Sequence, residues 1–109
     1  MNTAILYLYR DADNYKKDNY CIVEGEMTAE EEAAIVDSLF EGELFIPSAV
    51  GMPEVRFDDG ITEADGPWFE MMYKGFLPTD LPAGVNVTAS ELAKRFIAMK
   101  GKWESYLLT

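Results

Sequence analysis

The segment Ala4 to Arg10, with the sequence AILYLYR, restricts the fold more than any other part of the chain. Its apolar, aromatic and β-branched residues stand at both odd and even positions, which is typical of a strand buried on two faces. Such a strand needs a neighbour on each side and a layer packed over the sheet. The pattern therefore predicts a central strand, and residues 19–26 predict a second strand that pairs with it as a hairpin.

Two threonine and glutamate pairs with the same spacing predict the starts of two helices: Thr28 with Glu31, and Thr88 with Glu91. In such a capping box each of the two side chains satisfies a backbone N–H that the helix leaves free. The first helix is expected to end near Glu41 and to bury one apolar stripe, made of Ile35, Val36, Leu39 and Phe40. The second is expected to bury Leu92, Phe96, Met99 and Trp103.

The middle of the chain predicts the rest of the fold. Residues 45–53 hold two prolines and a glycine among apolar residues, so they are expected to pack as irregular chain. Two more strands are predicted at residues 55–57 and 68–73, with Pro78 and Pro82 breaking up the connector that follows. The order is then ββαββα. It predicts one α+β domain over residues 1–109, with a four-stranded, mainly antiparallel sheet and two helices packed on one face.

Net charge is the bulk property that excludes the most classes of binding partner. The chain has 20 acidic and 9 basic residues, no histidine and a formal net charge of −11. Fourteen of the acids lie in residues 24–70, where Arg56 is the single base. This balance argues against direct binding of nucleic acid or of an anionic membrane surface. It favours a basic protein as partner, because a one-sided field speeds such encounters.

The residue types that carry chemistry form no catalytic or metal-binding pattern in the sequence. Without histidine, a histidine base, the usual catalytic triads and histidine metal ligands are excluded. Two acidic turns, in residues 11–14 and 58–65, depart from the spacing of a calcium-binding EF-hand, and we expect no metal and no cofactor. Cys21 lies in an apolar run and is predicted to be buried. The expected compartment is the cytoplasm, because the sequence shows neither a signal peptide nor a membrane span.

Four segments resemble a family of small bacterial and mobile-element proteins to which no activity is assigned. They are YRDADNYK from Tyr9, EGEMTAEE from Glu24, FIPSAVGMP from Phe45 and DGPWFE from Asp65. Proteins of that family often carry histidines near the position of residues 68–70, and this chain has none there. The resemblance implies no reaction, substrate or cofactor, and it favours a phage or mobile-element setting.

These observations lead to the hypothesis of a non-enzymatic, acidic interaction protein that docks on a basic site of another protein. Its narrower form is a phage or mobile-element inhibitor that mimics nucleic acid and resembles anti-CRISPR proteins in size and charge. The predicted partner surface consists of Glu24, Glu26, Glu30, Glu31, Asp37, Glu41, Asp58 and Asp59. Two alternatives remain open. One is a small ligand-binding protein or enzyme with a pocket near residues 45–67, and the other is a homo-oligomeric module such as a homodimer.

Overall fold

The structure, a computed structural model, describes residues 1–10, 13–54 and 67–108 of the chain. Its elements are β1 (Asn2–Arg10), β2 (Lys16–Val23), α1 (Ala29–Ser38), β3 (Leu44–Phe45), α2 (Pro47–Val50), β4 (Phe69–Thr79), α3 (Ala89–Met99) and α4 (Trp103–Tyr106). The four strands form one antiparallel sheet in the order β2-β1-β4-β3. The α+β class predicted from the sequence is confirmed.

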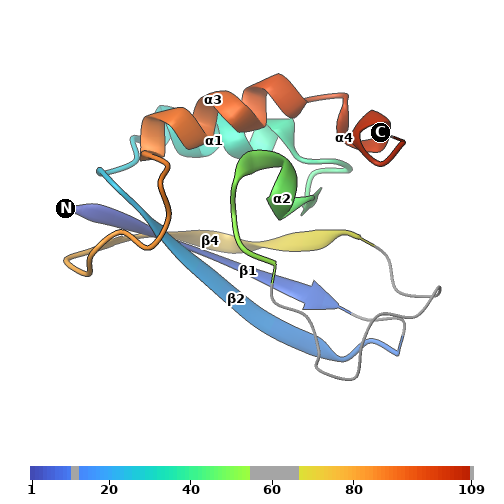
Figure 1. The fold of residues 1–109 in the computed structure, drawn as a ribbon, viewed down its shortest axis with the longest axis horizontal. Helices are drawn as coiled ribbons and strands as arrows, with labels where there is room; N and C mark the ends of the chain where they lie inside the picture. The colour runs from blue at the N-terminus through green and yellow to red at the C-terminus, as the bar shows by residue number, and fades with distance from the viewer. Residues whose placement is uncertain (11–12, 55–66, 109) are drawn as a thin grey trace.

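Strand β1 lies inside the sheet, between β2 and β4, as its sequence predicts. Its odd-numbered side chains from Thr3 to Tyr9 are buried, whereas the even-numbered ones are half-buried. The buried apolar ones join a core that includes Phe45, Phe96 and Trp103. In Figure 1, α1 and α3 lie side by side over the sheet. The predicted burial of β1 is therefore complete on one face and partial on the other.

The element order differs from the predicted ββαββα. Residues 45–53, expected to be irregular, contribute the end of the short strand β3 and the four-residue helix α2. Pro47 fits the first turn of α2, because a proline there removes an N–H that would have no partner within the helix. The last helical segment is split into α3 and α4 around Gly101, which has a positive φ of 74°. The strand predicted at residues 55–57 lies outside the described residues.

Helix α1 starts as predicted but ends earlier and faces the core differently. Thr28 Oγ1 accepts a hydrogen bond from the Glu31 N–H at 3.1 Å, and the Glu31 carboxylate accepts one from the Thr28 N–H at 2.9 Å. The helix ends at Ser38 rather than near residue 41. Ile35 is buried as predicted, whereas Val36 is 46% exposed, so its assignment to the core was wrong. Adjacent residues of a helix point about 100° apart, and the core reaches only the Ile35 side of α1.

Strand β4 is longer than predicted and contains a wide bulge. It continues to Thr79 and includes Pro78, which was expected to break up the chain after the strand. A proline is tolerated in a strand where its missing N–H would not face a partner strand. Near the middle of β4 a single β1 residue, Leu6, lies opposite four β4 residues, Met72 to Gly75. These four residues are called the β4 bulge below.

Helices α3 and α4 close the fold over α1. Trp103, the first residue of α4, is buried, and its indole N–H donates a 2.7 Å hydrogen bond to the Ser38 carbonyl at the end of α1. On the surface, the Lys100 ammonium pairs with the Asp37 carboxylate. Within the described residues, no helix combines the length and the apolar composition that a membrane crossing needs.

Candidate functional site

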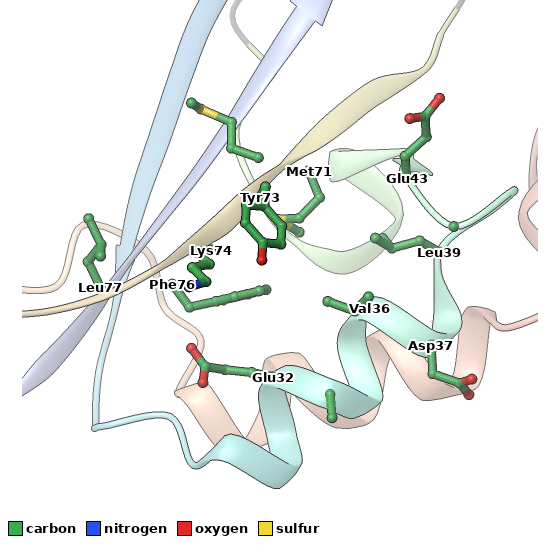
Figure 2. A pocket seen from close by; sticks show the side chains of 13 residues that line it. Glu32, Val36, Asp37, Leu39, Glu43, Met71, Tyr73, Lys74, Phe76 and Leu77 are labelled. Atoms are coloured by element: carbon green, nitrogen blue, oxygen red, sulfur yellow. The ribbon is translucent and has the colours of Figure 1, made fainter.

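An open groove of about 980 Å³ lies between α1 and β4, and we call it the α1–β4 groove (Figure 2). Its lining is mostly apolar: Ala33, Val36, Leu39, Met71, Phe76 and Leu77. Charged residues also line it, namely Glu32, Asp37, Glu43 and Lys74. Apolar surface rimmed by polar residues is typical of interaction sites in soluble proteins. The groove is therefore the candidate functional site.

The groove exists because β3 covers only the first part of β4. Strand β3 pairs with residues 69 and 70 of β4. One residue further, the Met71 N–H donates a 2.9 Å hydrogen bond to the Glu43 carbonyl. Beyond that point no strand in the described part of the chain covers this edge of β4. Phe76 and Leu77 therefore face the groove, with the Val36 side of α1 as the opposite wall.

The β4 bulge forms part of the groove lining and has an unusual backbone. Lys74 has a positive φ of 53°, a conformation that residues other than glycine rarely adopt. At Gly75 a Cβ atom would lie only 2.7 Å from the Leu6 carbonyl oxygen, so the close approach of β1 and β4 requires glycine. Tyr73, which lies between Met72 and Lys74, is 89% exposed and projects toward α1 in Figure 2. Bulges and unusual backbone conformations of this kind concentrate at functional sites.

A smaller hollow of about 220 Å³ adjoins the groove, because Glu32 and Phe76 line both. It extends the concave surface toward Glu26, Met27 and Pro78. The loop before α1 is held there by Thr3, whose hydroxyl donates to the Gly25 carbonyl at 2.8 Å and accepts from the Met27 N–H at 2.9 Å.

The carboxylates of the groove differ in whether they form an ion pair within the protein. Asp37 is paired with Lys100, so part of its charge is compensated within the chain. Glu32 and Glu43 form no ion pair with another described residue. In Figure 2 they lie at opposite ends of the groove. The groove therefore offers, near each end, one carboxylate that forms no ion pair within the described residues. Glu43 also interacts electrostatically with Arg10, whose pKa it helps to raise.

The predicted partner surface is only partly brought together by the fold. Glu26 lines the small hollow and Asp37 the groove. Glu30 and Glu41 are exposed but line neither, and the Glu31 carboxylate serves the capping box. The backbone of Glu24 is hydrogen-bonded to residues 87 and 89, at the start of α3. Asp58 and Asp59 lie outside the described residues.

The roles of Glu32, Glu43 and the apolar lining from β4 were not predicted from the sequence. One signal was available for Glu32, because it precedes Val36 by four residues and so lies on the same face of the helix. The β4 lining carried no such signal, since Pro78 suggested that the strand ended earlier. The groove depends on the bulge and on an edge of β4 that no strand of the described residues covers, and both are features of tertiary structure.

The described residues with perturbed pKa values do not line the groove. Burial strongly raises the pKa of Tyr7 and raises that of Cys21 to about 12. The pKa of Arg10 is raised mainly by its hydrogen bond to Glu70, whose carboxylate lies 2.7 Å from the guanidinium, and also by the negative charge of Glu43. Strongly shifted pKa values often mark catalytic sites, but these three residues do not line the groove. Within the described residues, no three acidic or cysteine side chains are grouped as metal ligands.

The alternative pocket near residues 45–67 can be compared with the structure only in part. Phe45, Ile46, Val50 and Met52 are buried and belong to the hydrophobic core. Phe45 packs edge-to-face on Tyr7, with ring centroids 5.5 Å apart. In residues 45–54 the large apolar side chains therefore serve core packing, and residues 55–66 lie outside the described residues.

Comparison with known proteins provides no relative from which a function could be transferred. Neither a protein-family model, nor a curated protein, nor a solved structure matches this chain. The resemblance to mobile-element proteins therefore stays a prediction, and the function is argued from the residues of the groove.

Proposed function

We propose that this protein is a non-enzymatic binding protein that docks a basic segment of a partner protein in the α1–β4 groove. The observation that carries the proposal is the combination of exposed and half-buried apolar side chains, which we call the floor of the groove (Val36, Met71, Phe76 and Leu77), with a carboxylate near each end. Val36 and Leu77 are each 46% exposed within the groove, an arrangement that leaves apolar surface in water unless a partner covers it.

The charge of the chain supports a basic partner over a neutral one. Residues 24–70 contain 14 acids and one base, and Glu32 and Glu43 belong to this stretch. Complementary charge around an apolar contact speeds association and discriminates against acidic competitors. The apolar floor would then contribute most of the affinity and the carboxylates most of the selectivity.

Two features favour binding over catalysis. The floor of the groove is built from aliphatic, aromatic and methionine side chains, whereas acid–base chemistry needs polar groups that converge on a substrate. The three described residues with shifted pKa values lie outside the groove. The groove is therefore better suited to hold a partner than to transform one.

The inhibitor hypothesis is the narrower form of this proposal. A basic segment that fits the groove could belong to a nucleic-acid-binding site, and an acidic protein seated there would block that site. The exposed acids Glu26 and Glu30, near the start of α1, would extend the negative surface beyond the groove. A phage or mobile-element setting for the protein belongs to this narrower form.

Selection from a display library of random peptides tests the proposal without assuming a partner. The library is selected on the wild-type protein and counter-selected on Val36→Glu, which places a charge in the apolar floor. Ile97→Glu is the matched control, because Ile97 is a comparably exposed apolar residue of the other long helix, α3, and does not line the groove.

We expect the selected peptides to be rich in Lys, Arg and apolar residues, to bind Ile97→Glu as they bind the wild type, and to bind Val36→Glu at least tenfold more weakly. Peptides without excess positive charge, or peptides that bind both variants equally, would contradict the proposed function.

A further inference from the structure

The open edge of β4 first suggests that a partner would add a strand to the sheet. The edge beyond Met71 has no strand beside it in the described chain, and extended peptides bind such edges through backbone hydrogen bonds. That mode needs a regular row of N–H and C=O groups along the edge strand. The local structure of β4 decides whether such a row exists.

Strand β4 is poorly suited to receive another strand. At the β4 bulge four residues lie opposite Leu6, and Lys74 adopts a left-handed conformation, so the regular extended backbone is interrupted. Four residues beyond Lys74, Pro78 has no N–H to donate. A bulge, an exposed lysine and a proline are devices by which edge strands avoid pairing with further strands. Strand addition is therefore disfavoured along the part of β4 that borders the groove.

The volume and lining of the groove suit a helix instead. Two turns of an α-helix, about 10 Å wide, occupy roughly 850 Å³. The groove measures about 980 Å³, with the smaller hollow adjoining it. Met71 and Met72 line the groove, and methionine side chains adapt to the irregular surface of a docked helix. A helix satisfies its own backbone hydrogen bonds, so the interrupted edge of β4 costs it nothing.

We infer that the occupant of the groove is a basic amphipathic helix of a partner protein, seated with its apolar face on Val36, Met71 and Phe76 and with Lys or Arg side chains beside Glu32 and Glu43. This inference rests on the proposed function and adds the conformation of the partner. Charge complementarity supports it, because two carboxylates that form no ion pair within the described residues lie at opposite ends of the groove.

Two synthetic peptides of identical composition separate a helix from a strand. Both have about 16 residues, contain only Leu and Lys, and are long enough to form a helix on binding. One places Leu at helical spacing and the other alternates Leu and Lys, so their total charge and apolar content are the same. A third peptide repeats the helical pattern with Glu in place of Lys. Binding is measured by isothermal titration calorimetry, and peptide conformation by circular dichroism.

We expect the helical Leu/Lys peptide to bind at least tenfold more tightly than the alternating one and to gain helix on binding. Equal or tighter binding of the alternating peptide would overturn the helix but leave the proposed function standing. If neither Lys peptide binds, or if the Glu peptide binds as well as its Lys counterpart, the proposed function fails as well. A dimer in sedimentation that Val36→Glu disrupts would identify a second copy as the occupant and would also overturn the inference.

A measurement on the unaltered protein locates the bound helix. Methyl-labelled methionine gives six NMR signals, one for each methionine of the chain. We expect the helical Leu/Lys peptide to shift the signals of Met71 and Met72, in the groove, while those of Met52, in the core, and Met99 of α3 stay in place. Shifts confined to methionines outside the groove would overturn the inference.

Discussion

The adjacent residues Ile35 and Val36 give the sharpest test of how α1 faces the core. Ile35 is completely buried and Val36 is 46% exposed. Truncating a buried isoleucine to alanine costs about 2–5 kcal/mol of unfolding free energy. Val36→Ala removes the equivalent of two CH₂ groups, each worth about 0.8 kcal/mol when fully buried and about half of that here. Alanine is also the better helix former, by about 0.5 kcal/mol, so the net cost at Val36 is about 0.3 kcal/mol.

Thermal unfolding of the two alanine variants measures this difference. For a domain of this size 1 kcal/mol corresponds to a shift of about 4–8 °C in Tm. Ile35→Ala should therefore lower Tm by at least about 8 °C, and Val36→Ala by at most about 3 °C. Comparable losses at the two positions would mean that Val36 packs against the core and does not belong to the exposed lining of the groove.

Three further predictions concern the packing of the core and of the sheet. Trp103→Phe should cost about 1–3 kcal/mol in urea unfolding, because the Ser38 carbonyl loses its 2.7 Å donor; unchanged stability would contradict this role. Gly75→Ala should cost about 1–3 kcal/mol, because its Cβ would meet the Leu6 carbonyl oxygen at 2.7 Å; a neutral effect would show that the bulge can relax. Burial raises the pKa of Cys21 from 9.0 to about 12, so the neutral thiol stabilises the fold fully below pH 9 and this contribution is lost as the pH rises toward 12. Cys21→Ala should therefore lose less stability than the wild type between pH 9 and pH 12. The same loss of stability with pH in both proteins would contradict the raised pKa.

Local sequence signals predicted the elements whose formation depends on near neighbours. The central position of β1 followed from a segment with apolar and aromatic residues at both odd and even positions, which favours a strand with a neighbour on each side. The start of α1 followed from Thr28 and Glu31, because both hydrogen bonds of the capping box form within four residues. These predictions succeeded because the decisive interactions were local or followed from burial alone.

The groove depends on contacts between elements that are far apart in the sequence, and local sequence patterns do not predict such contacts. Val36 shares an apolar stripe with Ile35, and only the position of the neighbouring elements decides which of the two is buried. Pro78 marks a strand end by local rules, but it is tolerated in β4 beyond the two residues that β3 covers. Of the predicted acidic surface, Glu26 and Asp37 line the concave region, whereas Glu31 completes a helix cap. A count of acids could not distinguish these roles.

The central claim is that the carboxylates of the α1–β4 groove attract a basic segment, and a comparison of two double variants tests it most directly. Glu32→Gln with Glu43→Gln removes the two groove carboxylates that form no ion pair within the described residues. Asp18→Asn with Glu104→Gln removes the same net charge from exposed positions that do not line it. The affinity of each for the helical Leu/Lys peptide is measured by titration calorimetry at low and at physiological salt.

Exposed ion pairs contribute about 0.2–1 kcal/mol each, so losing two should weaken binding by about two- to thirtyfold in the groove variant. The control should bind nearly as the wild type does. The difference should shrink at physiological salt, where charges are screened beyond about 8 Å. Equal losses in the two variants, or a groove variant that binds as tightly as the wild type, would contradict the account.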